Sequence, residues 1–190
     1  SWADLLAVAD LLPPGMQVAV DGLWHLPPDE AIAMGRDLDA RRGRWLECPL
    51  YPEDVAGHAA LAAAIATPIA VGESYRTPAE MRPFFGIAKI LQPDLGRCGI
   101  SGFMRIAAEF PGELVPHLSI AMGPQVAAAI HVAAAVPRCG LCEYNPAVLE
   151  TANAFLAEPI SCRGGRYAVP ESPGLGIAWN DRGCGLLGGS

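Results

Sequence analysis

In Trp45-Leu46-Glu47-Cys48-Pro49-Leu50 an apolar run leads to a carboxylate, and a proline loop follows at once. Asp21 stands 26 residues before Glu47, and Glu73 stands 26 residues after it. Each of these acids closes a short apolar run of the kind that forms a β-strand. One carboxylate therefore ends each of three successive predicted strands.

The series continues at intervals of 21, 23 and 26 residues with Asp94, His117 and Glu143. A strand, a loop, a helix and a return loop need about this many residues, and parallel strands joined in this way present functional groups at their C-terminal ends. A single acid at the end of a strand is more often a helix cap. Six ionisable residues in register instead predict six β/α units of an α/β protein, a (β/α)8 TIM-type barrel.

The predicted barrel is incomplete. A closed barrel of this type has eight strands and typically about 250 residues, whereas this chain has 190. A helical pattern over residues 2–12, stopped by Pro13-Pro14-Gly15, precedes the first predicted strand. We therefore expect that two strands before it are missing, that one domain spans residues 1–181, and that residues 182–190 form a tail.

Helix start and stop signals fill the intervals between the strands. Acids in the first turn and arginines in the last turn mark one helix, and Thr77-Pro78-Ala79-Glu80 is a capping box with proline at the first helical position. The other helices are indicated by the spacing of their apolar residues and by prolines near their first residues. Helices are predicted at residues 2–12, 28–42, 52–66, from 77 onward, and at 101–110, 124–136 and 146–156.

Composition and charge exclude several classes of partner. Hydrophobic residues make up 52% of the chain, which is enough for a sizeable core. The net charge of −7 and the scattered basic residues argue against a nucleic-acid or anionic membrane surface. The apolar run at residues 119–136 is rich in alanine and is interrupted by Gly123, Pro124 and Gln125, so it predicts a packed helix. Six cysteines without paired CxxC clusters, and no leader before Ser1, predict a cytoplasmic protein with a small-molecule partner.

The six residues at the strand ends divide into two chemical groups. Asp21, Glu47 and Glu73 supply hard oxygen ligands from three consecutive strands, which favours Mg²⁺. His117 comes one strand after Asp94, which can orient the imidazole through Nδ1 and leave Nε2 to exchange a proton with a substrate. The sequence therefore predicts a magnesium site and a catalytic dyad at the same end of the barrel.

The motifs around these residues resemble those of the enolase superfamily, in its mandelate racemase-like branch, over residues 2–181. These motifs identify the superfamily specifically, but they say much less about which substrate is used. The matching runs are Val20-Asp21, Leu46-Glu47-Cys48-Pro49, Val71-Gly72-Glu73-Ser74, Gln92-Pro93-Asp94-Leu95-Gly96-Arg97-Cys98-Gly99, Pro116-His117 and Cys142-Glu143-Tyr144.

The resemblance implies abstraction of the proton α to a carboxylate through an enediolate, with Mg²⁺ held by the three carboxylates of the first group. By the same resemblance His117 is the base or acid, Asp94 is its partner, and Glu143 donates a hydrogen bond to the substrate carboxylate. Two features depart from the branch. Leu23 stands where its members usually have Asn, and the lysine motif of the second strand and the N-terminal capping domain lie outside this chain.

Three hypotheses for function follow. The first is a magnesium-dependent acid-sugar dehydratase, a lyase. The second is a racemase or epimerase of a 2-hydroxy acid, which needs a second base on the opposite face of the substrate. The third is a truncated, non-catalytic remnant. The coding sequence upstream would discriminate between them, and we expect the full-length protein to be a homo-oligomer.

Overall fold

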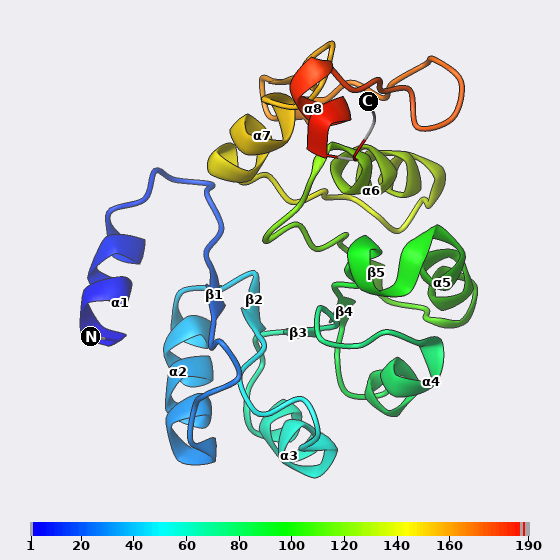
Figure 1. Cartoon of the computed structure of the whole chain (residues 1–190). Helices are drawn as coiled ribbons and strands as arrows, with labels where there is room; N and C mark the ends of the chain where they lie inside the picture. The colour runs from blue at the N-terminus through cyan, green and yellow to red at the C-terminus, as the bar shows by residue number, and fades with distance from the viewer. Residues whose placement is uncertain (1, 187, 189–190) are drawn as a thin grey trace. The chain divides into compact units, whose positions relative to one another are not determined.

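The computed structural model describes residues 2–186 and residue 188. Strands and helices alternate from α1 to α6, as predicted (Figure 1). The first half contains α1 (Trp2–Asp10), β1 (Ala19–Asp21), α2 (Pro28–Ala40), β2 (Trp45–Glu47), α3 (Val55–Ala64), β3 (Ile69–Val71), α4 (Pro78–Met81) and the 3-10 helix η1 (Arg82–Phe84). The second half contains β4 (Ile90–Leu91), α5 (Leu95–Glu109), β5 (Glu113–Leu114), α6 (Gly123–Ala135), α7 (Pro146–Asn153), β6 (Cys162–Arg163), β7 (Arg166–Tyr167) and α8 (Asp181–Leu186).

The first five strands form a sheet in the order β1-β2-β3-β4-β5. β1 pairs with β2 and β2 pairs with β3, both in parallel, and Asp21 lies opposite Glu47 in the register. Sequential parallel strands connected by helices are the repeat of a (β/α) barrel. The predicted incomplete barrel is confirmed, and its strands are short.

The chain divides into two compact units. The first comprises Ser1–Val71 and Gly86–Ile90. Within it α2 packs against β2 and α3 (Figure 1), and Leu38, Leu46 and Leu61 are almost fully buried. Asp29 and Glu30 lie in the first turn of α2, where the helix dipole favours negative charge. This packing fixes the strands that end at Asp21 and Glu47.

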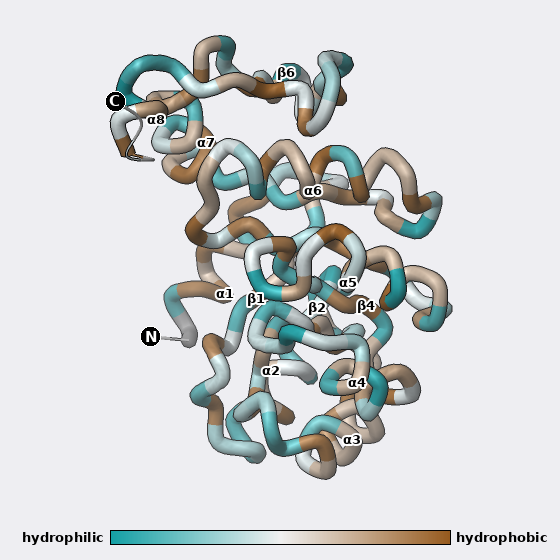
Figure 2. Tube along the Cα trace, turned by 45° about the vertical axis from the view of Figure 1, so that its right-hand side comes forward, coloured by the Kyte–Doolittle hydropathy of each residue, from teal (hydrophilic) through white to brown (hydrophobic). Residues whose placement is uncertain are grey.

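The second unit comprises Gly72–Phe85 and Leu91–Ser190. Its α5 packs against α4 and α6, and the side chains of Phe84, Phe103 and Phe110 are completely enclosed. Figure 2 shows α6 mostly in the colours of hydrophobic residues, which agrees with its burial. Arg82 donates two hydrogen bonds to the carboxylate of Glu109, at 2.7 and 2.9 Å, and so ties η1 to the end of α5.

Helix α5 is interrupted at Gly99, which has φ +66° and ψ 171°. Such a positive φ is easily adopted only by glycine. The part after Gly99 corresponds to the predicted helix at residues 101–110. The turn before it begins at Leu95 and is capped by Asp94, whose side chain accepts a hydrogen bond from the Gly96 N–H. The predicted helix therefore begins six residues too late.

The sixth predicted strand, at Leu141 and Cys142, is not formed. The N–H of Leu114 in β5 donates to the carbonyl of Arg138, at 3.1 Å, and residues 140–145 make no strand pairing in the described part of the chain. Leu141 is 45% exposed, whereas the residues of β3 and β4 are buried. A run of two apolar residues after Gly140 is too short to compete with a loop.

The C-terminal region contains a hairpin and a helix that were not predicted from the sequence. β6 and β7 form an antiparallel hairpin around Gly164 and Gly165, whose φ angles are +57° and +72°. This glycine pair is typical of a tight hairpin turn. The predicted domain boundary at residue 181 stays a prediction. Of the predicted tail, residues 182–186 belong to α8, while residues 187, 189 and 190 lie outside the described residues.

Among the described residues, no helix is long and apolar enough to cross a membrane.

Candidate functional site

His117 lies between two carboxylates in the second unit. Its Nδ1 is 2.9 Å from Asp94 Oδ2, and its Nε2 is 2.6 Å from Glu73 Oε2. His117 and Asp94 are 9% and 8% exposed. The predicted dyad of His117 and Asp94 is therefore present as a contact, and Glu73 belongs to the same cluster. Because a carboxylate only accepts, Nδ1 donates its proton to Asp94.

The backbone next to β4 and β5 brings the dyad together. The Val115 N–H donates to the carbonyl of Leu91 at 2.9 Å, and the His117 N–H donates to the carbonyl of Pro93 at 3.2 Å. Asp94 and His117 are thus partners in a parallel bridge just beyond the two strands. Functional groups at the C-terminal ends of parallel strands are expected in this architecture.

Glu73 is positioned by the glycine that precedes it. Gly72 has φ +152°, and a Cβ built on it would lie 2.5 Å from the backbone nitrogen of Gln92. Any side chain at this position would push the two chain segments apart. Glycine therefore allows the segment bearing Glu73 to run directly against the segment that leads to Asp94.

Glu143 joins the cluster although its predicted strand is missing. Its Oε2 accepts a hydrogen bond from the N–H of Leu118, the residue after His117. Burial raises the pKa of the Glu143 carboxyl above its ordinary value, and so do the nearby charges of Glu73 and Asp94, whereas His117 and the Leu118 N–H lower it. The net direction is upward, which favours the protonated form that can donate a hydrogen bond.

The environment of His117 favours its charged form. Burial alone would lower the pKa of the imidazole, but the hydrogen bonds to Asp94 and Glu73 and the charge of Glu143 outweigh it. Together these groups raise the pKa of His117 from 6.5 to about 10. A carboxylate within hydrogen-bond reach on each ring nitrogen is the cause.

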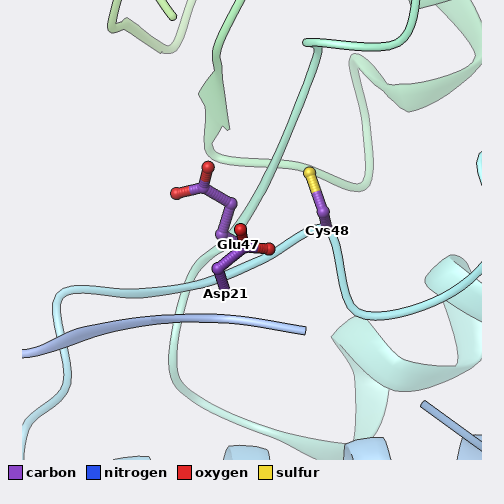
Figure 3. A group of neighbouring side chains, drawn as sticks. All are labelled: Asp21, Glu47 and Cys48. Atoms are coloured by element: carbon purple, nitrogen blue, oxygen red, sulfur yellow. The ribbon is translucent and has the colours of Figure 1, made fainter. Parts of the chain in front are cut away.

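A second group of candidate ligands lies in the first unit. Asp21, Glu47 and Cys48 each offer one ligand atom, and these atoms lie within 4.8 Å of one another (Figure 3). The Nε1 of Trp45 donates to Glu47 Oε2 at 2.8 Å, and the N–H of Leu23 donates to Asp21 Oδ1 at 2.8 Å. Two of the three predicted magnesium ligands are therefore neighbours. Their convergence with Glu73 stays a prediction.

The loop after Asp21 departs from ordinary backbone geometry. Leu23 and Trp24 have φ +52° and +64°, in the left-handed region that disfavours branched side chains. Asn tolerates this region better than Leu. The difference from the family pattern at Leu23 thus falls on a residue where Asn would fit the backbone more easily.

Sequence reasoning missed three residues of these groups, namely Gly72, Gln125 and Cys48. Gln125 Nε2 donates to Asp94 Oδ1 at 3.0 Å. Gln125 also lines a cavity of about 370 Å³ together with the dyad, Glu73, and Gly96, Arg97, Ser119 and Ile120. The helical pattern of residues 124–136 contained no signal for Gln125, because a polar residue in the first turn of a helix is ordinary.

Comparison with known proteins places these observations in a family. The family model for enolase C-terminal domain-like proteins matches residues 2–183. L-talarate/galactarate dehydratase of Salmonella typhimurium is 32% identical over 184 residues, which cover 94% of this chain and 44% of that protein. D-galactarolactone cycloisomerase of Agrobacterium fabrum is 31% identical, over 93% of this chain and 50% of that protein.

Solved structures of members of this superfamily are also similar to this chain. L-talarate dehydratase from Polaromonas sp. JS666, complexed with Mg and L-glucarate, has a TM-score of 0.82 and 32% identity, over 96% of this chain and 50% of that chain. A member of the enolase superfamily from Agrobacterium tumefaciens has a TM-score of 0.90 and 29% identity, over 97% and 49%. The chain spans about half the length of the curated relatives it matches. It belongs to the enolase C-terminal domain-like family.

Proposed function

We propose that the protein carrying this chain is a magnesium-dependent acid-sugar dehydratase. The observation that supports this most is the His117 ring, held by Asp94 at Nδ1 and aimed by Nε2 at a carboxylate cluster. A histidine held in this way can exchange a proton with a substrate. The sugar-acid dehydratases among its relatives support the choice of substrate class.

The predicted metal ligands are Asp21, Glu47 and Glu73. The donor set fits Mg²⁺, because carboxylate oxygens are the ligands this cation prefers and because two of these carboxylates are already neighbours. When bound, Mg²⁺ supplies positive charge that stabilises the negative charge developing on the substrate carboxylate. General acid-base catalysis alone contributes roughly 10²- to 10⁴-fold in rate, so an additional source of stabilisation is needed.

The side chains of the second unit carry out the proton transfers. His117 acts as a base once Nε2 has released the proton that it donates to Glu73. Nε2 then takes the proton from the carbon α to the substrate carboxylate, and Asp94 keeps the ring in place from the other side. The electron pair left by that proton forms an enediolate and then a C=C bond to the β-carbon, while the bond from the β-carbon to its hydroxyl oxygen breaks. The hydroxyl leaves as water after it receives that proton back from His117 Nε2. Glu143, with its raised pKa, donates a hydrogen bond to the carboxylate.

Isomerisation is the second candidate. A relative of nearly equal identity is a cycloisomerase, and proton abstraction α to a carboxylate is common to both chemistries. A racemase needs a second base on the opposite face of the substrate, and we expect that base outside residues 1–190. The product formed by the intact protein from an acid sugar distinguishes the two reactions, because only dehydration yields a 2-keto-3-deoxy acid.

The test is hydrogen exchange at the α-carbon. The intact protein is incubated with Mg²⁺ and an acid sugar in deuterated water, and incorporation of deuterium is followed by NMR. We expect His117→Asn to lower the exchange rate by at least about 10²-fold, because Asn cannot accept the proton. Chelation of the metal should abolish exchange in the parent.

His25→Asn is the matched control, because His25 is exposed and lies outside the series of strand-end residues. Its exchange rate should equal that of the parent. Exchange at the parental rate in His117→Asn would remove His117 from the mechanism, and metal-independent exchange would remove Mg²⁺.

A further inference from the structure

Gln125, in the first turn of α6, contacts the carboxylate of Asp94. Resting on the proposed function, we infer that Gln125 is a positioning residue that fixes the Asp94 carboxylate, so that Asp94 in turn fixes the His117 ring. Gln125 does not contact His117 in any described hydrogen bond and acts through Asp94 alone.

The two oxygens of Asp94 are used differently. Oδ2 receives the Nδ1–H of His117 at 2.9 Å. Oδ1 accepts two hydrogen bonds, from the Gly96 N–H at 2.7 Å and from Gln125 Nε2 at 3.0 Å. Donors from α5 and α6 thus hold one oxygen, so that the carboxylate cannot rotate without breaking both bonds. A catalytic group must be held to within about 0.5 Å by such supporting contacts.

Close packing places the amide of Gln125 at this point. Gly123 opens α6, and a Cβ built on it would lie 2.7 Å from Leu156 Cδ2, so α6 begins in direct contact with the chain after α7. Gly96 leaves room on the other side, because its Cβ would lie 2.7 Å from Gln125 Oε1. Two glycines therefore permit the approach of Gln125 to Asp94.

A purely structural role for Gln125 predicts a different result from a positioning role. If Gln125 only stabilised the start of α6, its loss would lower the melting temperature and leave the hydrogen bond between His117 and Asp94 unchanged. If it positions Asp94, its loss loosens that hydrogen bond while binding of the substrate changes little. The readout must therefore report on the Nδ1–H of His117 and on KM and kcat separately.

The first experiment uses ¹⁵N-histidine labelling of the intact protein. The chain described here contributes four histidines, and His117→Asn assigns the signal of His117. Gln125→Met keeps the length of the side chain but removes the donor. We expect the Nδ1 proton of His117 to exchange with water about tenfold faster in Gln125→Met than in the parent. Gln17→Met, at an exposed glutamine, should leave it unchanged.

The second experiment measures turnover. Gln125→Met should lower kcat about tenfold, with KM and the affinity for Mg²⁺ within about twofold of the parent, since a hydrogen bond to a charged group is lost. Should Gln125→Met fail to fold, Gln125→Leu, which also lacks the donor, takes its place, and the same changes are expected.

The outcomes separate this inference from the proposed function. Parental exchange of the Nδ1 proton and parental kcat in Gln125→Met, together with loss of activity in His117→Asn, overturn the role of Gln125 and leave the proposed function intact. Full activity in His117→Asn overturns the proposed function. The NMR result on the His117–Asp94 hydrogen bond stands independently of activity.

Discussion

At the scale of single residues, the position of Glu73 depends on the absence of a side chain at Gly72. The backbone there has φ +152°, and the place of a Cβ is filled by the backbone of Gln92. Both a strained conformation and a steric overlap would follow from substitution. Neither feature is visible in the sequence, where Gly72 reads as one of 21 glycines.

We expect Gly72→Ala to lower the free energy of unfolding by about 3 kcal/mol, from backbone strain together with overpacking. Gly86→Ala is the matched control, because Gly86 has an ordinary φ and no atom within 4 Å of its Cβ. Its effect should stay within about 0.5 kcal/mol. Urea denaturation measures both variants. Equal stability of Gly72→Ala and the parent would show that the close approach to Gln92 is not required.

At the scale of elements, one carboxylate joins α2 to the loop before β3. Asp39 accepts hydrogen bonds from the Thr67 N–H at 2.5 Å, the Thr67 hydroxyl at 2.6 Å and the Ala66 N–H at 3.0 Å. Burial raises the pKa of Asp39, but the bonds from Ala66 and Thr67 outweigh it and lower the pKa below 3.8. The charged form is therefore the one that the fold stabilises.

Asp39→Asn should lower the free energy of unfolding by about 2 kcal/mol at neutral pH, because bonds to a charged acceptor become bonds to a neutral amide. The pKa of Asp39 is lower in the folded state than in the unfolded state. Its contribution is therefore complete above the unfolded value of 3.8 and is lost as the pH falls through the folded value. Urea titrations at pH 7 and about pH 3 check this. The expectation would be contradicted if the difference in unfolding free energy between Asp39→Asn and the parent did not become smaller in acid. Glu53→Gln, which changes an exposed acid, is the control and should show no such dependence on pH.

How much the sequence could predict differs between elements. The acids at strand ends, the capping box at Thr77 and Glu80, and the dyad were predictable, because each depends on local pattern or on the regular period. The prediction of a strand before Glu143 was wrong, because two apolar residues are too few to indicate a strand. Gln125 was missed because its partner, Asp94, lies 31 residues away, at the cap of another helix.

At the scale of the whole molecule, exposed apolar groups and outer strands predict self-association. β1 and β5 are the end strands of the described sheet. α1 exposes Leu5 and Val8 by 56% and 60%, and Leu11, which follows α1, is 84% exposed. An outer strand offers unpaired N–H and C=O groups, and exposed apolar side chains favour contact with another surface.

We expect residues 1–190, produced alone, to associate and to show no turnover of acid sugars. Sedimentation velocity measures the size, and Val8→Lys combined with Leu11→Lys should shift the distribution toward monomers. Glu53→Lys, which adds charge at an exposed site elsewhere, is the control and should change the distribution less. A monomeric chain with a cooperative melt and magnesium-dependent turnover would contradict the expectation.

The break at Gly99 has a mechanical consequence. The turn before it carries the cap at Asp94, whereas the longer part after it packs into the core through Phe103 and Ile106. An unbroken helix transmits bending along its length as a rod, but the non-helical backbone at Gly99 acts as a joint. Substitutions on the exposed face of the long part, at residues such as Met104, should therefore leave the positions of Asp94 and His117 unchanged. The exposed surface of the long part can therefore change in sequence while the turn capped by Asp94 keeps its position.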